Sequence, residues 1–358
     1  MFKKIYPVVT LLVLSLTFVS WGWLGHQTIS GKCPESFPAS MAGFSVWGDS
    51  LALHGSDADN RKGSDSNESP KHYIDIDSYA EFNSTGRIAS TYDSIVKIHG
   101  SGFVINNGTL PWATLNMYDT LVVDFRKLKW HKAMLDASDL GHYVGDGHMP
   151  LHLTENYDGR MTGQSGIHSR YESTMVSNYI SQLSNYSGDS IHFINNVNKY
   201  IFDYIYTNYH YVDSVLAADT YAMNQSGNNT SAQYYAALWS KTHFTTTLFH
   251  NASHSLAELI YSAWIEAGRP PFYAKTVSNS IINTPVDNIS VYPNPTQGIV
   301  NLKGNSVFKT DVFDMTGKLL EIYTDNQFDL SNLSNGIYIL SIYSKEGKLT
   351  KEKVLLAK

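Results

Sequence analysis

Histidines and carboxylates are concentrated in residues 140–172, at spacings that suit metal binding. His142 and Asp146 are four residues apart, and so are His168 and Glu172. Because residues four apart share one face of a helix, each pair can point at a common ion. Imidazole nitrogen and carboxylate oxygen are both ligands that zinc accepts, usually four to an ion. Two such pairs in one stretch therefore indicate several metal ions.

Further candidate ligands lie outside these pairs. Pro150 ends the first helix of the stretch, so that His152 beyond it turns toward another ion. Residues 54–77 form a polar loop by composition, and His72 is the residue of this loop that we favour as a metal ligand. Together the candidates are too many for one zinc ion and about enough for two or three.

The N-terminus indicates a secreted protein. Residues 1–20 contain two lysines followed by an apolar run, too short to span a bilayer but typical of a signal-peptide core. We expect cleavage after Ser20. Cleavage would give Trp21 a free α-amino group, with a pKa of about 8 and a lone pair that can bind metal. His26 is close enough in sequence to join it.

Length and composition set the frame for these elements. The 358 residues suffice for one large and one smaller domain, and the apolar fraction of 42% is ordinary for a globular protein. A net charge of -6 argues against a basic groove for nucleic acid, although zinc ions would supply positive charge. With Cys33 as the single cysteine, no internal disulfide can form. Stability must then come from the core and any bound metal.

Helical periodicity predicts the elements that carry the candidate ligands. It runs through residues 79–138 and 173–267. Apolar residues at three-to-four spacing mark the core-facing positions: Trp112, Leu115, Tyr118 and Val122 in the first segment, and Leu248, Leu256, Leu259, Ile260, Ala263 and Trp264 in the second. Near the second stripe lie His243, His250 and His254, which we interpret as surface or capping residues in preference to ligands.

The C-terminal part has a different character, because all 14 histidines precede it. Residues 273–288 are expected to be a linker, and residues 289–358 contain short β-branched and aromatic runs separated by turns. They predict a small all-β sandwich without site chemistry. Through YPNP, VFDMTGK, NGIYIL and a basic last strand, this tail resembles the sorting domain of type IX-secreted bacterial proteins. The resemblance implies contact with the type IX secretion machinery and a secreted or cell-surface location, with the tail removed or anchored.

The remaining motifs point to one family. WGWLGH, ADNRK, KHYID, HYVGDGHMPLH and HSRYE occur in this order between Trp21 and about Gly268. In this set the chain resembles the zinc-dependent phospholipase C and S1/P1 nuclease superfamily. The resemblance implies an all-α catalytic domain over residues 21–272, with three Zn²⁺ ions and phosphodiester hydrolysis by zinc-activated water. No stable protein partner is implied.

The resemblance also implies a ligand set. The expected zinc ligands, ion by ion, are Trp21, His26 and a bridging Asp146; Asp146 again with Asp59, His72 and His142; and His152, His168 and Glu172. Asp59 and Asp146 are assigned as catalytic carboxylates. The third zinc would neutralise charge on the phosphoryl oxygens and the departing alkoxide.

Several assignments stay open within this set. Asp57 and Asp59 both precede His72 by about the family spacing, and Asp59 is favoured because it follows an alanine. Asp75 is a candidate to accept the free N–H of a ligand imidazole. His148 lies between ligands, and we expect it to line the cleft or face water.

The substrate is equally open. The spacing from Trp21 to His26 is nuclease-like, whereas Glu172 is phospholipase-like. Asn60 stands where the family's choline site would have an aromatic residue. Tyr73 is either a base-stacking, substrate-binding residue or a core tyrosine.

Three functions therefore remain in view. We favour a phospholipase C-like enzyme acting on a phospholipid. The first alternative is a nuclease for single-stranded DNA or RNA, and the second is a non-catalytic surface protein stabilised by zinc.

Overall fold

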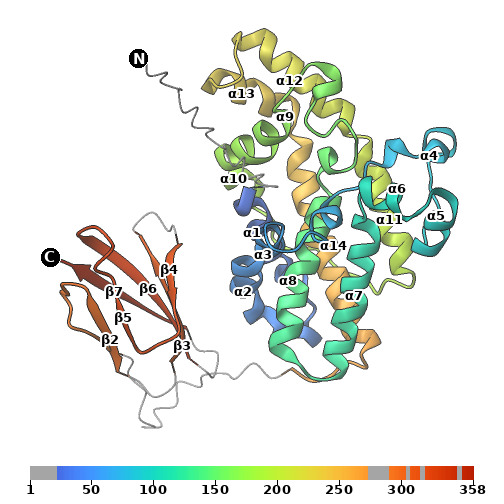
Figure 1. Ribbon diagram of the computed structural model, residues 1–358. Coiled ribbons are helices and arrows are strands. Elements are labelled where there is room, and N and C mark those ends of the chain that lie inside the picture. The colour runs from blue at the N-terminus through green and yellow to red at the C-terminus, as the bar shows by residue number, and fades with distance from the viewer. Residues whose placement is uncertain (1–21, 273–289, 304–306, 315–318, 345–348) are drawn as a thin grey trace, which may run out of the picture. The chain divides into compact units, whose positions relative to one another are not determined.

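The computed structural model describes residues 22–272, 290–303, 307–314, 319–344 and 349–358. The chain divides into two compact units, residues 1–276 and 277–358. The first is helical and the second is a β-structure (Figure 1). The expected signal peptide, the linker and the candidate ligand Trp21 lie outside the described residues.

The helical unit contains long and short helices in the following order: α1 (Gly22–Lys32), α2 (Gly48–His54), α3 (Asp57–Arg61), α4 (Ala80–Thr85), α5 (Tyr92–His99), α6 (Ser101–Asn106), α7 (Leu110–Arg126), α8 (Trp130–Gly147), α9 (Ile167–Ser169), α10 (Val176–Leu183), α11 (Val197–Tyr209), α12 (Val212–Ser226), α13 (Ala232–Lys241) and α14 (Phe244–Glu266). Short 3-10 segments cover Cys33–Ser36, Ala39–Trp47, Ser69–His72, Ile76–Ser78, Pro150–His152 and Arg160–Thr162, and a π-helical segment covers Arg170–Met175.

Helix α8 lies at the centre of the helical unit, packed against α7 and α14 (Figure 1). Every residue from Leu140 to Gly147 is buried. The predicted core positions on α7 and α14 are also buried, with Leu115 partly so. The apolar stripes thus face one another around α8, which holds the candidate ligands on its C-terminal half.

Two glycines of α8 allow α1 to approach closely. A Cβ atom on Gly141 would lie 2.6 Å from Ser30 Oγ, and one on Gly145 would lie 2.9 Å from His26 Nδ1. Both distances are shorter than van der Waals contact. The absence of side chains at these positions therefore lets α1 bring His26 against α8.

The segment expected to be a polar loop is more ordered than its composition indicated. It contains α3 and the 3-10 turn Ser69–His72. Asp57 and Asp59 lie in the first turn of α3, where carboxylates interact favourably with the positive end of the helix dipole. Because residues two apart on a helix lie on different faces, these two carboxylates point in different directions.

The β-unit consists of two antiparallel sheets. Its strands are β1 (Ser290–Tyr292), β2 (Ile299–Lys303), β3 (Val307–Phe313), β4 (Leu319–Tyr323), β5 (Gln327–Asp329), β6 (Gly336–Ser344) and β7 (Leu349–Leu356). The sheet orders are β1-β2-β5 and β4-β3-β6-β7. In the longest pairing, Gly336 lies opposite Leu356 and Tyr343 opposite Leu349.

Side chains from both sheets share one apolar core, which includes Val300, Phe328, Leu340 and Val354. The expected fold classes, all-α followed by a small all-β sandwich, are confirmed. None of the helices in the described part of the chain combines the length and apolar character needed to cross a membrane.

Candidate metal centre

Three groups of ligand side chains come together in the helical unit. In each group the candidate ligand atoms lie within 4.8 Å of one another: His26, His142 and Asp146; Asp59, His72 and His142; His152, His168 and Glu172. These are the sequence-predicted ligands of the described residues, brought in from α1, α3, α8 and the segments around them. The candidate ligand residues remain a prediction, but their side chains do converge.

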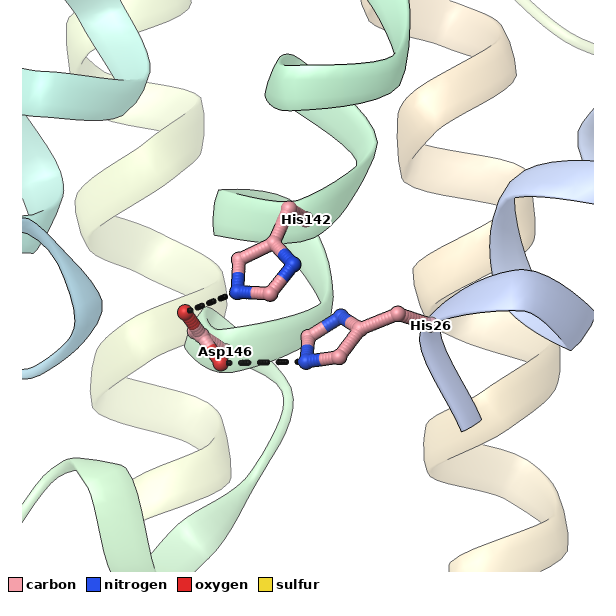
Figure 2. A group of neighbouring side chains, drawn as sticks. All are labelled: His26, His142 and Asp146. Atoms are coloured by element: carbon pink, nitrogen blue, oxygen red, sulfur yellow. Dashed lines mark ion pairs between the residues drawn. The ribbon is translucent and has the colours of Figure 1, made fainter. Parts of the chain in front are cut away.

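Asp146 lies between the groups, and its two oxygens face different neighbours. Oδ1 lies 3.5 Å from His26 Nε2 and 3.2 Å from His152 Nδ1. Oδ2 lies 3.0 Å from His72 Nδ1 and 3.4 Å from His142 Nε2. Figure 2 shows one oxygen of the carboxylate directed at the ring of His26 and the other at the ring of His142. This is the position that a carboxylate bridging two ions requires.

Backbone carbonyls fix the orientation of two ligand histidines. The Nδ1–H of His142 donates to the Gly55 carbonyl at 2.8 Å, and that of His152 donates to the His72 carbonyl at 2.6 Å. A carbonyl oxygen only accepts, so each Nδ1 carries the hydrogen. When the ring is neutral, the lone pair of each Nε2 is then directed to the cluster, as outer hydrogen bonds commonly arrange for metal-bound imidazoles.

His72 is turned the other way. Its Nδ1 lies 3.0 Å from His142 Nε2 and 3.6 Å from Asp59 Oδ1. Two ring nitrogens this close need a proton or another cation between them to make their approach favourable. The surroundings thus fit a cation held jointly by His72, His142 and Asp59.

The choice between the two aspartates of α3 is clear in the geometry. Asp59 is almost buried, and its Oδ1 lies 3.5 Å from His142 Nε2. Asp57 instead pairs with His54 Nδ1 at 2.7 Å, and its side chain is 44% exposed. Asp59 also contacts Lys62 Nζ at 2.6 Å. Asp59 is therefore the aspartate that faces the candidate ligand histidines, and its role as a ligand stays a prediction.

The third group lies at the junction of α9 and the π-helical segment. His168 Nε2 is in contact with Glu172 Oε2, and the same oxygen lies 3.4 Å from His152 Nε2. Short π-helical segments within helices often occur at functional sites. His168 is 21% exposed in its side chain, which makes this group the one that solvent reaches most readily.

Several buried polar atoms of the candidate ligand residues lack hydrogen-bond partners among the described residues. They are both ring nitrogens of His26, His72 Nε2, His168 Nδ1, Asp59 Oδ2 and Glu172 Oε1. A buried polar atom without a partner costs roughly 1–3 kcal/mol, and an uncompensated buried charge costs more. The donor set of nitrogens and carboxylate oxygens therefore fits divalent cations such as zinc.

Burial and neighbouring charges shift the pKa values of the candidate ligand histidines. Burial, aided by the charge of His142, lowers the pKa of His26 to about 3, so that its ring is neutral and has a free lone pair. Burial also opposes charge on His152, but Asp146 and Glu172 outweigh it and raise its pKa to about 9. In the metal-free chain a proton thus occupies His152, and a bound cation would compete with that proton.

Two expectations about neighbouring residues differ from the structure. His148 does not line a cleft or face water: it is 1% exposed, its Nδ1–H donates to the Val144 carbonyl, and its ring stacks on Tyr204. The Nδ1–H groups of His142 and His152 are satisfied by backbone carbonyls, which leaves Asp75 without the expected role for them. Local backbone geometry supplied acceptors that sequence spacing could not reveal.

The other singled-out residues lie as follows. Tyr73 is half-buried and its hydroxyl donates to the Asn106 carbonyl at 3.2 Å. His250 contacts Asn185 and His254 contacts Glu258, so both lie outside the three groups, as interpreted.

Asp75 lies near His152 of the third group, and two further acidic residues lie near Asp75. Burial and the charges of Asp77 and Glu155 raise the pKa of Asp75 to about 7, and His152 opposes the shift. Tyr157 lies edge-on to His168, with ring centroids 5.6 Å apart. An aromatic ring thus lies beside His168, and carboxylates lie near His152.

Comparison with known proteins supports the assignment of the tail. Residues 290–356 match the family described as the secretion system C-terminal sorting domain. This match supports a secreted or cell-surface location. The chain is also 29% identical over 75 residues to beta-agarase D from Zobellia galactanivorans, covering 20% of this chain and 16% of the agarase. The match thus spans less than a fifth of the length of that curated relative.

Solved structures that resemble the chain include two clostridial alpha toxins. One is an alpha toxin from Clostridium absonum, with 10% identity, a TM-score of 0.45 and coverage of 93% of this chain and 96% of the toxin. The other is the Clostridium perfringens alpha-toxin of an avian strain, with 9% identity, a TM-score of 0.45 and 95% coverage of both chains. Likeness at this level is too weak to assign an activity.

Proposed function

We propose that this protein is a secreted zinc-dependent phosphodiester hydrolase of the phospholipase C type. The observation that carries the proposal is the position of Asp146, whose two oxygens face different groups of histidines in a buried site. A single structural zinc ion would need only one closed set of four ligands. Three adjoining groups, one of them partly exposed, are better suited to catalysis.

Zinc supplies a Lewis acid and a water molecule that loses its proton near neutral pH, both suited to attack on a phosphodiester. The chain would hold three such ions. Asp146 and Asp59 would place negative charge next to the bound ions. The rings of His26, His142 and His152 would offer neutral nitrogens once any protons on them are displaced. The buried position of these groups excludes bulk water and strengthens their electrostatic interactions.

The surroundings of the third group favour a phospholipid over a nucleic acid. A polyanionic strand near His152 would meet the negative charges of Asp77 and Glu155, and like charges repel. A zwitterionic head group places one positive charge next to its phosphate and would be tolerated there. Tyr73 and Tyr157 add aromatic surface on the same side, and we retain Tyr73 as a substrate-binding residue.

The sorting-domain match also bears on export. We propose that the tail is read by the type IX secretion machinery after an N-terminal signal has directed the chain across the inner membrane. The tail would have no part in hydrolysis, since its core is built from apolar side chains and contains none of the candidate ligands.

Activity assays on the full mature protein test this function. Zinc-loaded and chelator-treated samples are incubated with phosphatidylcholine vesicles and, separately, with denatured DNA and RNA. Zinc-dependent release of diacylglycerol is expected. Release of nucleotides without release of diacylglycerol would show that the protein is a nuclease and not a phospholipase. Full zinc content without turnover of any phosphodiester would favour the non-catalytic surface protein.

A further inference from the structure

Glu68 is a buried carboxylate beside the metal centre that the sequence did not single out. It is 1% exposed and immediately precedes the 3-10 turn that ends at His72. Its Oε1 lies 3.5 Å from His72 Nε2, the ring nitrogen on the side away from Asp146. This separation is longer than a normal hydrogen bond. The carboxylate is nevertheless the acceptor that faces this nitrogen.

Three side chains hold Glu68 in place and favour its ionised form. The Tyr143 hydroxyl donates to Oε1 at 2.5 Å, and Lys71 Nζ lies 2.7 Å from Oε2. Arg61 lies 3.4 Å from Oε1. Burying a carboxylate is costly because it loses its contacts with water, and these donors offset that cost.

The network is anchored on the same helix that carries the central ligands. Arg61 contacts Asp139 at 2.9 Å, and Asp139 and Tyr143 both belong to α8. Helix α8 thus presents His142 and Asp146 to the candidate ions and, next to them, supports the carboxylate behind His72. The two sides of the His72 ring are therefore positioned from one rigid element.

His72 needs such a partner because its ring is reversed relative to the other central histidines. His142 and His152 donate Nδ1–H to backbone carbonyls, whereas His72 uses Nδ1 toward the cluster. Its Nε2 has no hydrogen-bonding partner among the described residues and lies 3.5 Å from Glu68 Oε1. Only a hydrogen on Nε2 leaves the Nδ1 lone pair free for an ion.

We propose that Glu68 is a positioning residue that keeps the hydrogen of His72 on Nε2 and thereby directs the Nδ1 lone pair to the ion shared with Asp59 and His142. This inference rests on the proposed metal centre. Carboxylates in this relation to a ligand histidine fix the ring and make it a stronger ligand. Their removal typically weakens metal binding roughly 10- to 100-fold.

The test is zinc affinity of the full mature protein, measured by competition with a chelator. Glu68→Gln keeps the shape of the side chain but removes its charge. We expect one zinc ion to be bound roughly 10- to 100-fold more weakly, with the ion of the His168 group retained. A merely structural role would lower the thermal midpoint in excess chelator and leave the affinity unchanged.

The matched control is Glu81→Gln. Glu81 forms a carboxylate–imidazole pair with His99 Nε2 at 2.8 Å, outside the three ligand groups. Its loss is expected to leave all zinc affinities as they are. If Glu68→Gln does not fold, Tyr143→Phe is measured instead. It removes the hydroxyl that holds Glu68 without changing the charge, and a several-fold loss of zinc affinity is expected.

The outcomes separate the two proposals. Zinc binding by the unchanged protein together with equal affinity in the variant overturns the role of Glu68 alone. Failure of the unchanged protein to bind zinc overturns the metal centre and with it this role.

Discussion

Asp146 Oδ1 lies 3.5 Å from His26 Nε2. This contact joins the central helix α8 to the N-terminal helix α1. The other oxygen of the same carboxylate faces His142, four residues earlier on α8. His26 and His142 in turn stack with their ring centroids 3.7 Å apart and their planes inclined by 14°. Two helices distant in sequence thus meet at a single charged group, and the candidate ions depend on that meeting.

Replacement of Asp146 by Asn is the most direct test of this arrangement. The amide keeps the size of the side chain but loses the negative charge shared between the groups. We expect loss of two zinc ions and a fall in hydrolysis of at least about 100-fold, measured by elemental analysis and by turnover. Asp57→Asn, which alters only the exposed neighbour of His54, is the control. Full zinc content and turnover in Asp146→Asn would refute the ligand assignment.

The mature N-terminus provides a second prediction. If Trp21 binds zinc through its amino group, one extra residue before it should remove the ion held with His26, because an amide nitrogen has no available lone pair. Intact mass and zinc content are measured together. Trp21→Phe keeps the amino group and should keep the ion. An extended chain with unchanged zinc content would show that the amino group is not a ligand.

Gly145 tests the close packing of α1 on α8. A Cβ atom there would lie 2.9 Å from His26 Nδ1, and the His26 ring is held by its stacking on His142. We expect Gly145→Ala to lower the free energy of unfolding by about 1–3 kcal/mol and to weaken zinc binding at His26. In Gly102→Ala, also helical, the new Cβ has no neighbour within 4 Å, and stability should be unchanged or rise by up to about 1 kcal/mol. Urea unfolding compares the two variants.

The raised pKa of Asp75 predicts a pH dependence. In the folded chain this pKa is about 7, above the unfolded value of about 3.9. Folding therefore favours the protonated acid, a contribution that is complete below pH 4 and is lost as the pH rises through 7. Asp75→Asn resembles the neutral form, so it should gain stability relative to the unchanged protein between pH 4 and 8.

Urea midpoints of the chelator-treated proteins across this pH range measure the effect. Asp93→Asn, at an exposed carboxylate in the first turn of α5, is the matched control. A constant difference between Asp75→Asn and the unchanged protein would contradict the raised pKa.

The sequence by itself determined what depends on local geometry. The spacing of four between His142 and Asp146, and between His168 and Glu172, places each pair on one helical face, and the structure has both pairs in contact. Apolar periodicity likewise marked the buried faces of α7 and α14, and alternating strands marked the C-terminal sandwich. These features follow from backbone periods of 3.6 and 2, which a single chain segment expresses without its neighbours.

Only the tertiary structure decided which nearby side chains point into the cluster. Asp57 and Asp59 are two apart on α3 and so point in different directions, and only packing against α8 determines that Asp59 faces inward. The same holds for His148, which is buried against Tyr204, and for Glu68, which meets His72 across a tight turn. The physical reason is that the direction and burial of a side chain depend on which residues of another element pack against it. Spacing along the chain does not contain that information.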